Sequence, residues 1–260
     1  MRKVFKNLWG GALTTAFAVA MAAPALALEF DNPTEGWNIL WHELVIDLVI
    51  IGTLFGGIAL IWLFVYKAKN PNDHGQGPTL STSSAIGWAL IPAAVFMADD
   101  FFLAAKGWAL WNTQRTVPEG AMEVKVRAER WAWEFDYGNG VVSDTLTVPV
   151  GQPVVLRMTA KDDPAGRDVL HSFGMPHFRM TEDVMPGRTT YIWFKATEAV
   201  DTVVTCREYC GDGHSSMYST VSAKAEADFN QWMADELAAL EDNGTKQTAS
   251  VTVVGSGDKL

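Results

Sequence analysis

Two long apolar segments limit what this chain can fold into. The first runs from Leu44 to Tyr66, and at 1.5 Å of rise per residue it is long enough to cross a hydrocarbon core of about 30 Å. The second runs from about Ser84 to Trp111 and contains Pro92, which membrane helices tolerate where neighbouring protein satisfies the backbone. Both segments are predicted to be transmembrane helices that form a hairpin.

The charges beside these segments predict the orientation of the hairpin. The short connection contains Lys67 and Lys69, and the positive-inside rule places such a loop in the cytoplasm. We therefore assign residues 28–112 to an N-terminal segment and the hairpin, and expect everything beyond about residue 112 on the far side of the membrane.

Residues 1–27 have the features of an export signal. Basic residues precede an apolar run that ends in the small-x-small pattern Ala25-Leu26-Ala27. Because this order is typical of secretory signal peptides, the segment is predicted to be a signal peptide that is cleaved. An uncleaved anchor helix is the alternative.

From Glu123 onward the chain changes to short segments rich in Val, Thr and aromatic residues. Polar and apolar residues alternate in them, and clusters of Gly, Pro and Asp separate them, which is typical of strands and turns. The spacing predicts an all-β sandwich or barrel over residues 113–224. Residues 225–260 are predicted to be an amphipathic helix, to about Leu240, and a loose C-terminal tail.

The charge of the chain restricts its partners. The formal net charge is −10 at pH 7, whereas nucleic-acid binding depends mainly on Lys and Arg contacts to phosphates. The sequence therefore argues against nucleic acid and favours a basic protein partner.

Both cysteines of the chain lie in one short stretch, Cys206–Met217, which reads CREYCGDGHSSM. His214 follows Cys210 by four residues, and Met217 follows His214 by three. This combination of sulfur and imidazole donors suits copper, whereas zinc seldom binds methionine. In an exported domain, a disulfide between Cys206 and Cys210 is the alternative.

A second histidine is needed to complete such a site. His171 directly follows a β-type segment of the same domain, and His177 is the competing candidate. A single-copper site with two histidines and a weak axial methionine needs only one thiolate. Two cysteines therefore imply more than a single-copper site, and two thiolates can bridge two copper ions, each of which then takes one histidine.

The order of these features resembles subunit II of the haem-copper cytochrome c oxidases. The resemblance covers roughly residues 37–240. It rests on the hairpin, the aromatic segment WAWEFDY, the histidine of DVLHS, and the motif C-x-E-x-C-G-x-x-H-x-x-M. It implies a transmembrane α-helical hairpin followed by an all-β cupredoxin-like domain, a Greek-key sandwich or barrel, which holds a dinuclear CuA centre.

The resemblance also implies a role for individual residues. The copper ligands would be His171, Cys206, Cys210, His214, Met217 and the backbone carbonyl of Glu208, whose side chain would bind a magnesium ion shared with subunit I. Trp131 would accept electrons from cytochrome c, although alternating aromatics can also simply line one face of a strand. Asp136 and Asp168 would dock the basic face of the donor.

The implied function is that of the electron-accepting subunit of a respiratory cytochrome c oxidase. Electrons would pass from cytochrome c through the dicopper centre to haem, which is held only by the partner subunit I. Oxygen reduction and proton pumping would occur there. The chain would lie in a bacterial inner membrane with other oxidase subunits, with two spans and its C-terminal domain in the periplasm.

Some residues depart from the family pattern, and other protein classes share parts of it. Ala85 stands where many members have a glutamate at the mouth of a proton pathway, and Arg207, Tyr209 and the Asp212-Gly213 pair also differ. Quinol oxidase subunits usually lack the copper ligands. Copper-delivery proteins of the thioredoxin type need βαβ alternation, and nitrous oxide reductase is a much longer soluble enzyme.

Overall fold

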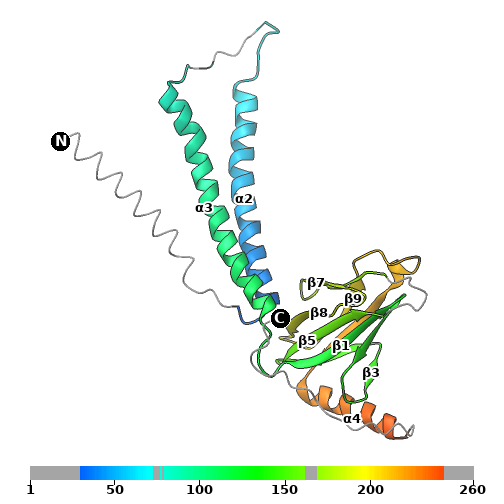
Figure 1. Ribbon diagram of the computed structural model, residues 1–260. Coiled ribbons are helices and arrows are strands. Elements are labelled where there is room, and N and C mark those ends of the chain that lie inside the picture. The colour runs from blue at the N-terminus through cyan, green and yellow to red at the C-terminus, as the bar shows by residue number, and fades with distance from the viewer. Residues whose placement is uncertain (1–29, 73–76, 78, 162–168, 243–260) are drawn as a thin grey trace, which may run out of the picture. The chain divides into compact units, whose positions relative to one another are not determined.

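The computed structural model describes residues 30–72, 77, 79–161 and 169–242 (Figure 1). The predicted signal peptide, Asp168 and residues 243–260 of the predicted tail lie outside the described residues. Among the described residues, 38–110 form one compact unit, and 30–37 together with the chain from 111 onward form a second.

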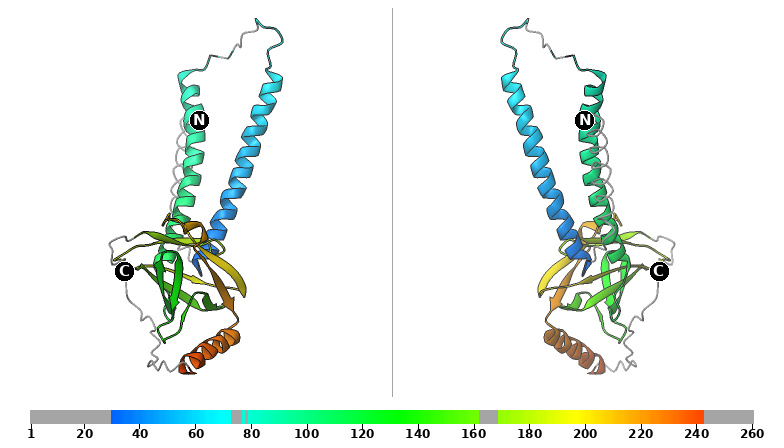
Figure 2. Two further views of the ribbon diagram at one scale, coloured as in Figure 1. Left: turned by 90° about the vertical axis from the view of Figure 1, so that its right-hand side faces the viewer. Right: turned by 90° about the vertical axis from the view of Figure 1, so that its left-hand side faces the viewer.

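The first unit is a helical hairpin. Helix α2 spans Pro33–Val65 and helix α3 spans Thr82–Arg115, and the two run in opposite directions (Figure 2). Each is long and apolar enough to cross a membrane. The predicted hairpin followed by an all-β domain is confirmed.

Helix α2 begins before its apolar segment, at a start that is capped by a polar side chain. The backbone N–H of Glu35 donates to the Asn32 side chain over 3.0 Å, with Pro33 at the first helical position. Such an Asn-Pro pair satisfies a free N–H group and pre-sets the backbone for a helix. Near the open end of the hairpin, Lys106 donates to the Glu43 carboxylate and thereby joins α3 to α2.

The second unit is a sandwich of two five-stranded sheets, ordered β3-β2-β1-β5-β8 and β4-β10-β9-β6-β7. The arrangement is cupredoxin-like. The strands are β1 (Met122–Glu129), β2 (Ala132–Asp136), β3 (Val142–Ser143), β4 (Leu146–Pro149), β5 (Pro153–Ala160), β6 (His171–Met175), β7 (Met180–Val184), β8 (Thr190–Lys195), β9 (Val200–Cys206) and β10 (Tyr218–Lys224).

The alternation seen in the sequence places one face of each sheet in the core. In β1, Val124, Val126 and Ala128 are buried, whereas the residues between them point outward. Phe135 of β2 and Phe173 of β6 join the two sheets, with ring centroids 6.2 Å apart. Burial of such side chains stabilises the fold by about 1.5–3 kcal/mol each.

A C-terminal helix closes one end of the sandwich. Helix α4 spans Glu226–Asp242 (Figure 2), close to the amphipathic segment expected from the sequence. Its apolar face packs against the core through Trp232, Met233 and Leu237. The ring of Trp232 lies 5.2 Å from that of Tyr137, so the helix covers core that would otherwise face water.

We expect Phe173→Ala to lower the free energy of unfolding of the sandwich by about 3–5 kcal/mol, because it leaves a cavity between the two sheets. Urea unfolding of the full chain in detergent, followed by the β-sheet circular dichroism signal, measures this loss. The matched control is Val203→Thr on β9, where the side chain is 44% exposed, and we expect a change within about 0.5 kcal/mol. Equal effects of the two substitutions would contradict this account of the core.

Candidate metal centre

The predicted donors lie at one end of the sheet that contains β6 and β9. His171 is the first residue of β6, and Cys206 is the last residue of β9. These strands are antiparallel neighbours, with Phe173 opposite Cys206. The chain then forms a loop with a short 3-10 turn, His214–Ser216, before it returns as β10.

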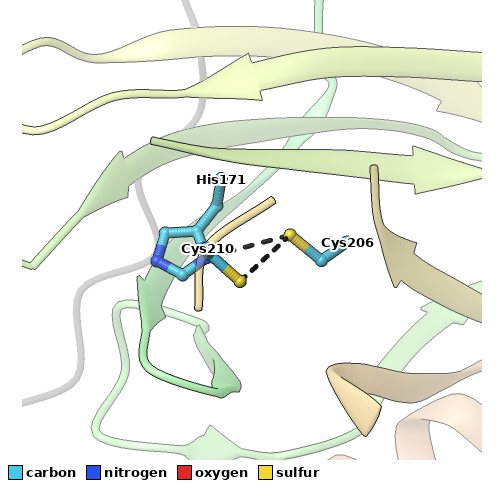
Figure 3. A group of neighbouring side chains, drawn as sticks. All are labelled: His171, Cys206 and Cys210. Carbon is cyan, nitrogen blue, oxygen red and sulfur yellow. Dashed lines mark hydrogen bonds between the residues drawn. The ribbon is translucent and has the colours of Figure 1, made fainter. Parts of the chain in front are cut away.

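The structure brings all six predicted donor groups together. His171, Cys206 and Cys210 are buried and point toward one another (Figure 3). The Cys206 sulfur lies 3.8 Å from His171 Nδ1 and 3.2 Å from the Glu208 carbonyl oxygen. The Cys210 sulfur lies 3.6 Å from His214 Nδ1 and 3.7 Å from the Met217 sulfur.

The two thiols are free and are not joined as a disulfide. Their sulfurs lie 3.8 Å apart, whereas a disulfide bond is about 2.05 Å long. The separation is also less than twice a metal–thiolate bond of about 2.3 Å, so a single ion is able to touch both sulfurs. The distance between the sulfurs therefore suits two thiolates that share a metal ion, and it is too long for the disulfide that the sequence left as the alternative.

Backbone hydrogen bonds hold the loop from Cys206 to Met217, the cysteine loop, against the sheet. Cys206 N–H donates to the Met217 carbonyl over 3.0 Å, which closes the loop at its base. Arg207 N–H donates to the Ser172 carbonyl of β6 over 2.8 Å, and Met217 N–H donates to the His214 carbonyl over 3.2 Å. The loop is therefore fixed at both ends, and its donors keep their relative positions.

Burial sets the protonation of the donors before any metal binds. It lowers the pKa of His171 to about 4, with smaller contributions from the positive charges of Arg130 and His214. Burial also raises the pKa of Cys210 to about 11, and the hydrogen bond and charge of Cys206 add to this. At neutral pH the His171 imidazole is thus free to bind a metal, whereas the Cys210 proton must be displaced.

The structure distinguishes between the two candidate histidines. His177 lies on the exposed surface, where its ring packs at 5.0 Å on that of Phe178. His171 lies in the donor group, with the Trp133 ring beside it at 6.0 Å. The choice follows from the position of each histidine relative to β6: His171 begins this strand, whereas His177 lies in the turn after it.

The aromatic segment divides into core residues and one surface residue. Trp133, Phe135 and Tyr137 are buried, as expected for residues that line one face of a strand. Trp131 lies in the turn between β1 and β2 and is 39% exposed. Its indole N–H donates to the Cys210 carbonyl over 3.3 Å, so this surface ring contacts the cysteine loop directly.

Of the two acidic residues predicted to dock the donor protein, the structure describes only Asp136. Asp136 forms an ion pair of 3.6 Å with Arg127 and accepts a hydrogen bond of 2.8 Å from Gly138 N–H. Part of its charge is therefore already balanced, and its docking role stays a prediction. Asp168 lies outside the described residues. Glu208 is exposed, so its side chain is accessible to an ion or a partner.

Comparison with known proteins identifies the domain that carries these donors. Residues 137–224 match the family described as "Cytochrome C oxidase subunit II, periplasmic domain". A protein named cytochrome c oxidase subunit 2 from Thermostichus vulcanus is 34% identical over 224 residues, which cover 80% of this chain and 61% of the relative. Residues 137–224 are therefore similar to the periplasmic domain of cytochrome c oxidase subunit II, and most of the chain is similar to a protein of that name.

Two further subunit II relatives show how much of the chain is shared. A protein of the same name from a Synechocystis strain is 35% identical over 215 residues, covering 78% of this chain and 61% of the relative. An alternative cytochrome c oxidase subunit 2 from Bradyrhizobium diazoefficiens is 25% identical over 230 residues, covering 77% and 81%. The chain thus spans less than two thirds of the Thermostichus and Synechocystis relatives and most of the Bradyrhizobium one.

The donor set fits copper, the metal implied by the subunit II family. Thiolate and thioether sulfurs with imidazole nitrogens are soft or borderline ligands, which copper prefers. All six donors lie within the matched residues 137–224, whereas Trp131 and the hairpin precede them. From the sequence, Trp133 is expected only as one of the aromatics that could line a strand face and Arg130 is not expected near the donors, since neither residue type signals a metal site by itself.

We expect copper affinity to rise with pH between pH 6 and pH 8. The Cys210 pKa of about 11 lies above this window, so binding releases its proton, and affinity should increase about tenfold per pH unit for each proton released. His171 adds no pH dependence here because its pKa is about 4. Competition titrations of the metal-free full chain measure the slope. Asp136→Asn should leave the slope unchanged, and a flat profile would contradict the predicted protonation state.

Proposed function

We propose that this chain is the electron-accepting subunit of a respiratory cytochrome c oxidase. In this proposal a dinuclear copper centre takes electrons from cytochrome c and passes them to haem in subunit I, where oxygen is reduced and protons are pumped. The main support is the meeting of the six donor groups around two free thiols, 3.8 Å apart.

Each donor has a distinct part in holding the centre. The thiolates of Cys206 and Cys210 would bridge two copper ions, and His171 and His214 would each bind one of them. The Met217 sulfur and the Glu208 carbonyl oxygen would complete the ligand set. Copper supplies one-electron redox chemistry, and the protein supplies a buried site of fixed shape, which limits rearrangement when the charge changes.

Trp131 would take electrons from cytochrome c into this site. Its exposed ring can meet a donor protein, and its indole N–H contacts the carbonyl of a predicted copper ligand, Cys210. Asp136 and Asp168 would steer a basic cytochrome c toward this surface, which would make the association rate sensitive to salt.

His214 is the proposed exit toward subunit I. It is only partly buried, and the exposed ring of Tyr209 lies 5.7 Å from its own ring. The Glu208 side chain on the same loop would bind magnesium at the boundary with subunit I. Other oxidase subunits would surround the hairpin in a bacterial inner membrane, with the sandwich in the periplasm. Ala85, near the start of α3, has no carboxylate, so it would not act as the glutamate that many family members have at the mouth of the proton pathway.

The fold separates this proposal from a copper-delivery protein of the thioredoxin type. That fold requires βαβ units, whereas residues 122–224 of the described chain form strands joined by turns and loops, with a single 3-10 turn. The complete donor set likewise disfavours a quinol oxidase subunit, which usually lacks these ligands.

Copper loading tests the central claim. We expect the full chain, reconstituted with copper, to bind two ions and to give an electron paramagnetic resonance spectrum with hyperfine lines from one electron shared by two equivalent coppers. Cys210→Ser should abolish this spectrum because it removes a bridge, and Met217→Leu should perturb it without abolishing it.

His171 and His177 provide a matched pair of variants for the copper experiment. His171→Gln should lose the shared-electron spectrum, whereas His177→Gln should retain it, since His171, unlike the exposed His177, lies within reach of the cysteine sulfurs. Loss of the spectrum in both variants, or in neither, would contradict the proposed ligand set. A chain that binds no copper would overturn the function itself.

Trp131→Phe should slow oxidation of reduced cytochrome c without changing the copper spectrum. The substitution removes the indole N–H that contacts Cys210, but it leaves every predicted ligand in place. Stopped-flow oxidation of cytochrome c measures the rate. An unchanged rate would show that electrons enter the centre by another route.

A further inference from the structure

The Trp131 ring lies directly on the backbone of the cysteine loop at Gly213. A Cβ atom added at Gly213 would lie 2.4 Å from Cδ2, 2.6 Å from Cγ and 2.7 Å from Cε3 of the indole. These distances are far below the normal van der Waals contact of about 3.5–4.0 Å between carbon atoms. The ring therefore occupies the space that any other residue at this position would need.

Gly211 contributes to the same surface from two residues earlier. Its own added Cβ would lie 3.3 Å from Cζ2 of Trp131, and its φ of +117° is a conformation that favours glycine. Gly211 and Gly213, on either side of Asp212, thus both lack a side chain where the backbone between Cys210 and His214 meets the indole. The indole lies against both glycines and reaches the Cys210 carbonyl with its N–H.

We propose that Gly213 is a positioning residue for electron uptake, because its lack of a side chain lets the Trp131 indole contact the backbone between Cys210 and His214, two of the proposed copper ligands. This inference rests on the proposed function. In the step concerned, a ferrous c-type cytochrome loses one electron and becomes ferric, and the dicopper centre gains that electron. Trp131 lies on the path and is returned unchanged.

The surroundings of Gly213 indicate that a substitution would move the ring and would leave the fold intact. The three atoms nearest to the added Cβ all belong to Trp131. Trp131 is 39% exposed and lies in a turn, so its ring is able to swing outward into solvent. Gly213→Ala should therefore weaken the contact between indole and loop while the buried sulfurs beneath keep their positions.

Gly174 offers a matched control on β6. An added Cβ there would lie equally close to a side chain, 2.4 Å from Arg207 Cγ. Arg207 has a long, flexible side chain that can rotate away, and the three nearest atoms all belong to it. Gly174→Ala thus introduces the same methyl group with the same nominal overlap near the centre, but it does not touch the indole.

The first readout is structural and needs no copper. In the metal-free full chain labelled with 5-fluorotryptophan, the Trp131 fluorine resonance is assigned by its loss in Trp131→Phe. We expect this resonance to shift toward a solvent-exposed position in Gly213→Ala and to stay in place in Gly174→Ala. An unshifted resonance in Gly213→Ala would overturn the proposal.

The second readout is the rate at which the copper-loaded chain oxidises a reduced, basic c-type cytochrome. We expect Gly213→Ala to lower this rate by roughly tenfold, since displacement of a positioned group by about 1 Å can cost up to about 10²-fold. Its copper resonance spectrum should match that of the unaltered chain. Gly174→Ala should match the unaltered chain in both the rate and the spectrum.

A double variant separates positioning of the ring from a general effect on the loop. If Gly213 acts through Trp131, adding Gly213→Ala to Trp131→Phe should cause less additional slowing than Gly213→Ala causes alone. A fully additive loss would overturn the proposal. If Trp131→Phe slows the reaction but Gly213→Ala does not, the inference about Gly213 fails and the proposed function stands. If Trp131→Phe has no effect, the proposed role of Trp131 fails and the inference falls with it.

Discussion

The pairing of β6 with β9 is the constraint on which the donor group depends. It places the first residue of β6, His171, beside the last residue of β9, Cys206, although 35 positions separate them in the chain. The hydrogen bond from Arg207 N–H to the Ser172 carbonyl continues this contact beyond the strand. Phe173 of β6 lies in the core between the two sheets of the sandwich. The packing that stabilises the sandwich therefore also fixes the His171 imidazole near the cysteine sulfurs.

Closure of the cysteine loop brings the donor groups of a short stretch of sequence together. Cys206 N–H reaches the Met217 carbonyl, so the loop folds back and its sulfur, imidazole and carbonyl groups face inward. Burial has opposite consequences for the two donor types, because it disfavours the charged form of each. The imidazole of His171 is kept neutral and available, whereas the Cys210 thiol keeps its proton until a metal replaces it.

The surface next to the cysteine loop carries Trp131, which contacts the loop. Trp131 is exposed to solvent on one side and meets bare backbone at Gly211 and Gly213 on the other. Asp136, on the neighbouring strand β2, already pairs with Arg127, so the charge it presents to a partner is reduced. The contact of the indole with the loop is thus the more direct link between this surface and the sulfurs beneath it.

The sequence by itself determined the features that depend on local order. Apolar runs defined the hairpin, alternation defined the strands, and the spacing from Cys206 to Met217 defined a copper-type donor set, since neighbours in the chain are also neighbours in a loop. Only the tertiary structure decided between His171 and His177, placed Trp131 on Gly213, and paired Asp136 with Arg127. Those outcomes depend on strand register and packing between distant segments, and residue spacing does not encode them.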